Sequence, residues 1–464
     1  MKKQHFPLPA AAWLGLSALL STGTALAQET QTSTPTAAVV EPPVSPPPSS
    51  PEVAPAEPAA DWGDFAASVA AAETPVFEAR FYGYIDTHFE QVADTPASID
   101  PMGNTVYEEN AYEWDVFNLH AMVQGTIMGR YRFFLNLASP GSGGIEDEPL
   151  VVRNAWVEAP IYQTYLQLRA GKTYRRFGLY NEILDAVPTF IGIETPELFD
   201  KDHLMLTRTT NFMLHGVANF DDVALNYSLA TGTDERAIHS VPLGADLHVT
   251  VGSLLKLGTS FYWSGGDALP TRGVGEGSPK GGVNNWMERD RYFVFGGYGQ
   301  LDWEGLIVQL EYWQAQHDAI RNVDSTLALI DADLNQRQRE RFFVGGDPAN
   351  GVNTDADFSV RTFYTRIGYD IKVGESSSVI PYVQLDYYSN PETINNKDFG
   401  GDAEAGLTAD GEFYKFTVGT VLRPIAPVAL KIDGSAHLQK FNGQTILYPE
   451  IRLSLSYLWE LGGI

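Results

Sequence analysis

A compact group of cations stands out in the segment RAGKTYRRFGLYNE, which spans residues 169–182. Arg169, Lys172, Arg175 and Arg176 fall within eight residues, although the whole chain has a formal net charge of −27. Guanidinium groups present planar donors that match carboxylate and phosphate oxygens. The cluster therefore predicts contact with small anions, or alternatively with acidic groups of the protein itself.

Carboxylates follow these cations along the chain, beginning with Glu182 and Asp185. If the segment lined a narrow passage, cations at one end and carboxylates along the rest would create a transverse electric field there. In the alternative interpretation, Arg175 and Arg176 pair with these carboxylates and fix the shape of the segment. The two interpretations are compatible, and the sequence leaves both open.

Other kinds of chemistry have weaker signals. No HExxH, GxSxG or P-loop motif occurs, so we expect no enzyme activity. The chain has no cysteine, which excludes disulfides and thiolate metal sites. Two Asp-x-Asp pairs, Asp331/Asp333 and Asp355/Asp357, lack the rest of a calcium-loop pattern, so we expect neither a metal site nor a cofactor. The acidic charge also disfavours nucleic acid as a partner.

The N-terminal region predicts export. Residues 1–27 combine a basic start, an apolar stretch and the end Ala25-Leu26-Ala27, as secretory signal peptides do; the alternative is a retained anchor. Residues 28–74 are rich in Pro, Ala, Ser and Thr and predict an extended linker with one short helix at 61–74. This linker serves as a spacer or, alternatively, contacts the cell wall.

A period-two pattern begins at Phe77. LIVQLEYWQ (306–314) and IRLSLSYLWE (451–460) alternate apolar with polar side chains, which is typical of strands and not of helices. Sixteen such segments lie near 77–90, 112–123, 128–138, 150–159, 164–172, 204–217, 223–230, 244–251, 254–263, 291–302, 305–316, 357–371, 379–389, 411–422, 428–439 and 450–460.

The connections between these segments alternate between long and short. The long ones are 91–111, 139–149, 173–203, 231–243, 264–290, 317–356, 390–410 and 440–449. Short periplasmic turns, long extracellular loops and an even strand number are typical of outer-membrane barrels. Residues 75–464 therefore predict an all-β transmembrane antiparallel β-barrel of about 16 strands in a Gram-negative outer membrane, with the N-terminal linker in the periplasm.

If the apolar faces contact lipid, the polar faces line the lumen. The cations predicted to point inward include Arg130, Arg132 and Arg169, together with several histidines and carboxylates. An open barrel of this size needs a constriction to select solutes, and the third long connection, 173–203, could fold inward to provide it. The predicted solute-contacting residues are Arg169, Lys172, Arg175, Arg176, Arg130, Arg132, Glu182 and Asp185.

The segments EPLVVRNAWVEAP (148–160) and LQLRAGKTYRRFGLYNE (166–182), within the sixteen-strand pattern, resemble Gram-negative outer-membrane porins, particularly the phosphate-selective porin (O and P) superfamily. The resemblance covers residues 77–464. It implies a homotrimeric channel for passive diffusion of small hydrophilic solutes, biased to anions such as phosphate or carboxylates by Arg169, Lys172, Arg175 and Arg176. The chain departs from the family pattern in its acidity and in ending on Ile464 rather than on an aromatic residue.

Two other classes of protein remain as alternatives. The first is a structural or adhesive envelope barrel tethered by its periplasmic linker. The second is an outer-membrane enzyme, which would need an acid–base motif that the sequence lacks. The expected partners are therefore small hydrophilic or anionic solutes, outer-membrane lipid and two further copies of the chain.

Overall fold

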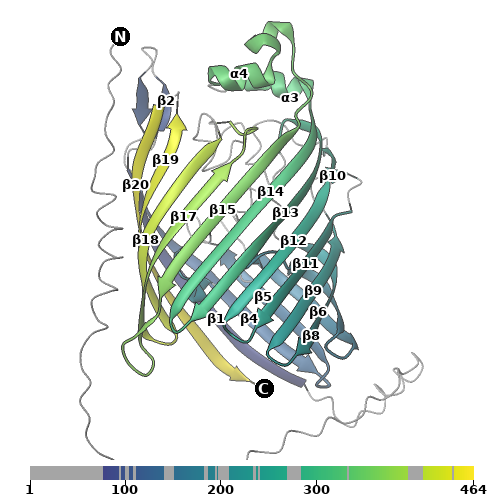
Figure 1. The fold of residues 1–464 in the computed structure, drawn as a ribbon, viewed down its shortest axis with the longest axis vertical. Coiled ribbons are helices and arrows are strands. Elements are labelled where there is room, and N and C mark those ends of the chain that lie inside the picture. The colour runs from purple at the N-terminus through teal and green to yellow at the C-terminus, as the bar shows by residue number, and fades with distance from the viewer. Residues whose placement is uncertain are drawn as a thin grey trace, which may run out of the picture. The chain divides into compact units, whose positions relative to one another are not determined.

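The chain forms a closed antiparallel β-barrel in a computed structural model (Figure 1). The structure describes residues 77–93, 96–99, 104–107, 111–140, 151–181, 187–193, 196, 208–233, 237–238, 241–268, 284–331, 334–394, 411–441 and 444–463. The predicted signal peptide and linker lie outside these residues, so the domain boundaries stay predictions.

Sixteen long strands make up the described wall. The first, β1 (Phe77–Val92), closes the barrel because it pairs with both β4 (Ala111–Ile127) and β20 (Gln444–Gly463). Between them lie β5 (Tyr131–Pro140), β6 (Val151–Tyr162), β7 (Leu166–Tyr174), β8 (Arg208–Phe220), β9 (Val223–Gly232), β11 (Leu243–Val251), β12 (Leu255–Ala268), β13 (Met287–Trp303), β14 (Leu306–Arg321), β15 (Phe358–Tyr369), β17 (Ser378–Ser389), β18 (Glu412–Ile425) and β19 (Val428–Phe441). Each predicted strand segment overlaps one of these strands, which confirms the predicted fold.

Among the described residues, four shorter strands accompany the wall. The first pair, β2 (Pro96–Ile99) and β3 (Thr105–Tyr107), forms a separate hairpin after β1. The other two extend the barrel sheet: β10 (Ala237–Ile238) pairs with β12, and β16 (Ile371–Lys372) pairs with β17.

The two faces of the wall differ in polarity, as the alternation predicts. On β14, Leu310 and Tyr312 are exposed on the outside, whereas Glu311 and Trp313 are buried on the inside. The same alternation runs through β19 and β20. A closed barrel with an apolar exterior leaves no strand edge unpaired in lipid and is the architecture of outer-membrane proteins, which confirms the predicted location.

Among the described helices, none is both long enough and apolar enough to cross a membrane.

Tight turns join the strands at one end of the barrel. Met128 and Gly129, between β4 and β5, have φ values of 57° and 60°. Positive φ at both central residues is the signature of the type I′ hairpin turn, whose twist matches that of the strands. Phe77 pairs with Ile127, and Gly463 pairs with Arg80, so both ends of the barrel chain lie at this short-turn end.

The prediction of a long connection at residues 440–449 is wrong. Residues 440–449 mostly continue the two strands, since Lys440 pairs with Thr445 and only residues 442–443 lie between β19 and β20. The reason is visible in the side chains, because Ile446 and Tyr448 are buried while Leu447 is exposed. This period-two alternation is that of a strand, and it continues through the segment interpreted as a loop.

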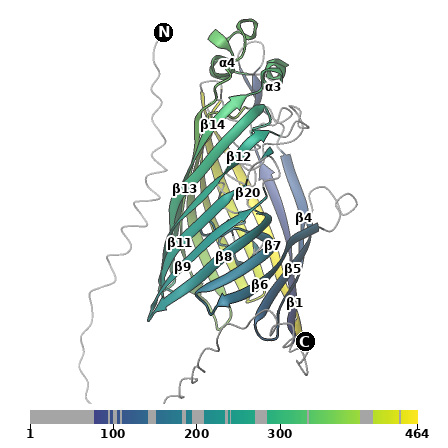
Figure 2. The ribbon, with the colours of Figure 1, turned by 90° about the vertical axis from the view of Figure 1, so that its right-hand side faces the viewer.

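The wall is uneven in height. Strands β6 and β7 have 12 and 9 residues, whereas β20 has 20. At about 3.3 Å per residue, the short strands end far below the tall ones. Figure 2 shows the low wall around β6, β7 and β8. The connection after β7 therefore leaves the wall well below the opposite rim.

The described part of the long connection between β14 and β15 folds into a helical cap, which we define as residues 322–331 and 334–357. It contains α3 (Val323–Ala328), η4 (Leu329–Asp331), α4 (Gln336–Phe342), η5 (Val344–Gly346) and η6 (Pro348–Asn350). Asn335 and Gln338 form a reciprocal capping box at the start of α4. An apolar cluster joins the cap to the start of β13, because Leu329 and Phe342 of the cap pack with Trp286, the residue before β13.

Candidate functional site

The connection after β7 crosses the lumen. Most of its described part, which we call the lumen loop, comprises residues 175–181 and 187–193. In the first half, the Gly178 backbone N–H donates to Ser260 Oγ of β12 at 3.1 Å. The next N–H, that of Leu179, donates to Glu311 Oε1 of β14 at 3.1 Å. The loop therefore lies against strands that are distant from β7 around the barrel.

The second half of the lumen loop contacts the wall farther round. It contains the short helix η2 (Val187–Thr189), and the Pro188 carbonyl accepts from Arg423 Nη2 of β18 at 3.0 Å. On β19, Lys431 Nζ donates to the Gly192 carbonyl at 2.8 Å, and Asp433 Oδ2 accepts from the Ile193 N–H at 3.0 Å. Since one segment contacts β12, β14, β18 and β19, it occupies the interior of the barrel.

Apolar packing also fastens the lumen loop. The Phe177 ring lies 4.2 Å from the Trp313 ring, centroid to centroid, and Tyr180 meets Tyr364 edge-on at 5.8 Å. Together with Phe190 these residues belong to one buried cluster inside the barrel. Burying one large apolar side chain contributes about 1.5–3 kcal/mol, so the loop is a fixed part of the fold and divides the lumen.

A buried carboxyl group organises the contact between loop and wall. Glu311 is fully buried and, besides the Leu179 N–H, accepts from the Tyr364 hydroxyl at 2.9 Å and from Trp313 Nε1 at 3.0 Å. The neighbouring Tyr180 hydroxyl donates to Gln309 Oε1 at 2.7 Å and accepts from Arg366. Burial raises the pKa of Tyr180, so its hydroxyl keeps its proton and remains a donor.

The predicted site residue Arg175 faces the wall and not open solvent. Its side chain is buried, with an exposure of 1%, and its guanidinium carbon lies 4.5 Å from the centroid of the Tyr262 ring. A cation over an aromatic face is attracted by the ring quadrupole. This position suits a role in holding the start of the loop better than contact with a solute.

Arg176 is half-buried beside it. The carboxylates predicted to pair with these arginines or to share the constriction with them, Glu182 and Asp185, lie outside the described residues.

Two other predicted cations meet a carboxylate on the inner wall. Glu158 of β6 accepts from Arg169 Nε at 2.9 Å and from Arg132, and it lies 2.9 Å from His215 Nε2. Arg169 also stacks over the Trp156 ring at 4.1 Å. The structure thus brings Arg132 and Arg169 together, as the inward parity predicts, but around an anion that offsets their charge.

The remaining two predicted cations are placed elsewhere. Arg130 closes the tight turn before β5 and is exposed. The prediction that Arg130 points inward from a strand is wrong, because the turn extends through residue 130. Lys172 pairs with Thr210, and Ala170 pairs with the outward-facing Phe212. Lys172 therefore falls on the outward parity, opposite to that of Arg169.

The sequence did not single out two of the anions that organise the inner wall. One is Glu158, whose neighbour Val157 is strongly exposed, so strict alternation from Val157 would have pointed Glu158 inward. The other is Glu450, which contacts His437 at 2.9 Å, Lys415 at 3.4 Å and also Arg452. At these two places on the inner wall, cations contact carboxylates.

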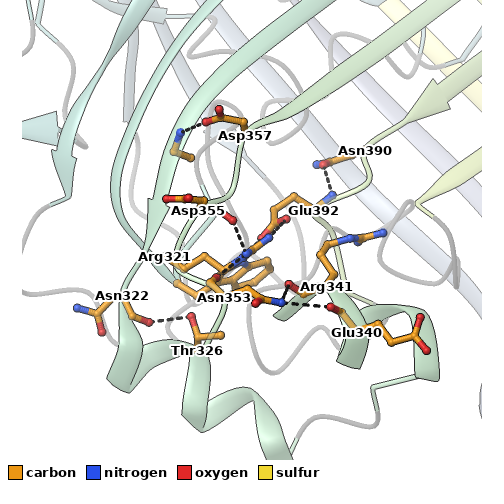
Figure 3. Close-up of polar contacts among 12 residues, drawn as sticks. Arg321, Asn322, Thr326, Glu340, Arg341, Asn353, Asp355, Asp357, Asn390 and Glu392 are labelled. Atoms are coloured by element: carbon orange, nitrogen blue, oxygen red, sulfur yellow. Dashed lines mark hydrogen bonds and ion pairs between the residues drawn. The ribbon is translucent and has the colours of Figure 1, made fainter. Parts of the chain in front are cut away.

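A second polar cluster lies under the helical cap. Arg321, at the end of β14, forms two 2.7 Å contacts with the carboxylate of Glu392, which follows β17. Its Nη1 donates to the carbonyl oxygens of Asn353 at 2.7 Å and Asp355 at 2.9 Å. Figure 3 shows Arg321 at the centre of these contacts. The buried guanidinium therefore ties the cap to the neighbouring connection.

Among the residues that the structure describes, no group of three or more His, Asp or Glu side chains could hold a metal ion.

Comparison with known proteins gives structural likeness only. No protein-family model matches the sequence, and no curated protein matches it. The barrel is similar to the outer membrane channel DcaP of Acinetobacter baumannii, with a TM-score of 0.49 and 9% identity over 82% of this chain and 97% of that one.

It is also similar to a loop L8 deletion mutant of OmpT, an outer membrane protein of Vibrio cholerae. Here the TM-score is 0.48 and the identity 10%, over 82% of this chain and 99% of that one. For OmpT in its trimer form, the TM-score is 0.47 and the identity 9%, over 82% and 99% of the two chains. We therefore assign the fold from the strand pairing of this chain itself, and the resemblance to the phosphate-selective porin superfamily stays a prediction.

Proposed function

We propose that this protein is an outer-membrane channel for passive diffusion of small hydrophilic solutes. The observation that carries the proposal is the lumen loop, which is fastened across a barrel whose inner wall is lined by charged and amide side chains. A loop that crosses a closed barrel narrows the passage, and the polar wall suits water and hydrated solutes. No energy source or cofactor is needed for such transport.

The anion bias predicted from the sequence is a finer part of this proposal. Arg175 is buried against Tyr262 and Arg169 contacts Glu158, so any bias rests chiefly on the half-buried Arg176. Assembly as a homotrimer, removal of residues 1–27 and a periplasmic position of the linker belong to the same proposal.

Planar-bilayer recording under a salt gradient tests both parts. We expect stable ion conductance from the purified protein and a reversal potential on the anion side, shifted toward cations in Arg176→Gln. The matched control is Lys172→Gln, which removes the same charge from the outward parity and should leave the reversal potential unchanged.

The outcomes separate the two parts of the proposal. Equal reversal potentials in the wild type and Arg176→Gln would refute the anion bias alone. Absence of conductance from the folded protein would refute the channel and favour the structural or adhesive barrel.

A further inference from the structure

A cavity lies on the short-turn side of the lumen loop, between the loop and the ends of β13 to β18. It has a volume of about 360 Å³, and the residues around it include Tyr180 and Phe190 of the loop and Gln300, Asp302 and Gln309 of the wall. This volume is at the lower end of the range for small-molecule pockets, about 300–1,000 Å³. The cavity therefore suits a single small solute.

A continuous relay of hydrogen bonds runs along the cavity. The Tyr180 hydroxyl donates to Gln309 Oε1 at 2.7 Å, and Gln309 Nε2 donates to Gln300 Oε1 at 3.1 Å. The relay ends where Gln300 Nε2 donates to Asp302 Oδ2 at 2.5 Å. Each primary amide has two N–H donors and two acceptor lone pairs, and the relay uses only part of this capacity. The relay fixes the orientation of the amides and leaves donors and acceptors side by side.

The charges around the cavity cancel. Among the described residues that line it, the charged side chains are Asp302, Asp370, Lys372 and Arg423, two anions and two cations. Asp370 forms an ion pair with Lys372 at 2.6 Å, and Arg423 donates to two backbone carbonyls of the lumen loop. No excess positive charge is left to favour phosphate or a carboxylate.

Aromatic rings complete the wall. Tyr180 and Phe190 meet at nearly a right angle, with 5.4 Å between ring centroids. Only a small part of either residue is exposed, 2% of Tyr180 and 3% of Phe190, and this part gives the cavity an apolar border for the C–H groups of a ligand. The combination of ring surface and paired amide donors and acceptors matches molecules that alternate C–H faces with hydroxyl groups.

We propose that this cavity is a binding site for an uncharged, hydroxyl-rich solute of monosaccharide size, held by Gln300, Asp302 and Gln309 against the rings of Tyr180 and Phe190. The site deepens the proposed channel function, on which it rests, by giving a chemical class to the transported solute. Hydroxyl groups of the solute donate to Asp302 and the amide oxygens and accept from the amide N–H groups.

Saturation-transfer NMR with D-glucose and the detergent-solubilised full chain tests the site. We expect saturable glucose binding that inorganic phosphate does not displace. Gln309→Met keeps the length of the side chain but removes the amide, and with two solute hydrogen bonds lost we expect binding about tenfold weaker or worse. Gln314→Met makes the same change on the outward parity of the same strand and should bind as the wild type does.

Each outcome decides the question. Absence of saturable glucose binding, equal affinity in Gln309→Met, or displacement of glucose by phosphate would overturn the proposal. If Gln309→Met does not fold, Tyr180→Phe removes the first donor of the relay and should also weaken glucose binding. Glucose binding without bilayer conductance would uphold the site and refute the channel, whereas conductance without glucose binding would do the reverse.

Discussion

The substitution Glu311→Ala tests whether the lumen loop sets the width of the passage. Glu311 is the acceptor for three buried donors, but only one of them, the Leu179 N–H, belongs to the loop. The other two donors, on Tyr364 and Trp313, lose their acceptor whether the loop is docked or released. Their loss therefore lowers the stability of the barrel and not the docking equilibrium of the loop.

The expected change in the docking equilibrium of the loop follows from the one loop donor that loses its acceptor, the Leu179 N–H. A buried donor left without an acceptor costs about 1–3 kcal/mol, and about 1.4 kcal/mol corresponds to a factor of ten. The ratio of docked to released loop should fall about 5- to 150-fold. The bond to Ser260 and the contacts with Lys431 and Asp433 remain, so we expect brief excursions of the loop and not permanent release.

Single-channel recording measures these excursions directly. The wild type should show one steady conductance level, and Glu311→Ala should add transitions to a higher level as the loop leaves the lumen. Glu311→Gln is the matched control, because it keeps a carbonyl oxygen in the place of Oε1 and should record as the wild type does. A steady wild-type conductance in Glu311→Ala would show that this contact does not control the width of the passage, and the reasoning would fail.

Two further predictions concern the ion pairs. Removing one partner of a buried pair costs about 3–5 kcal/mol, so Arg321→Met should loosen the helical cap and speed its limited proteolysis. The control Arg289→Met breaks an exposed pair with Asp318, which is worth about 0–1 kcal/mol, and should not change the rate of proteolysis. Equal digestion rates for the two variants would contradict the role of Arg321. Glu158→Gln removes the anion between Arg132 and Arg169 and should shift the reversal potential toward anions. Asp318→Asn, which removes the same charge from an exposed position, should not shift it, and a shift as large as that of Glu158→Gln would argue against a local effect of the inner wall.

Local patterns in the sequence were sufficient to predict the strands that form the wall of the barrel. A strand has a side-chain period of two, so the lipid-facing set can be read without knowing which strands are neighbours. The same rule also applies at residues 440–449, where the alternation continues and shows that the predicted long connection is mostly strand. Arg130 was misplaced because a strand boundary shifted by three residues, which changes a luminal position into a turn position.

The candidate site was less predictable, because its contacts join residues far apart in the chain. Leu179 meets Glu311, 132 residues away, and Ile193 meets Asp433, 240 residues away. The inward parity of Arg169 could be predicted, but its partner Glu158 depends on the register between β6 and β7. Arg175 belongs to a conspicuous basic segment, yet the side chain it packs on, Tyr262, comes from a different part of the barrel.

The sequence by itself determined the strands, the apolar exterior and the position of a long connection after β7, because these properties depend on the local alternation of side chains and on chain length. The tertiary structure decided which cations are balanced by carboxylates, that the lumen loop crosses the barrel, and that Tyr180, Gln309 and Gln300 meet at one cavity. The physical reason is barrel closure. It fixes the register of every strand against its neighbours and so determines which distant side chains share the lumen.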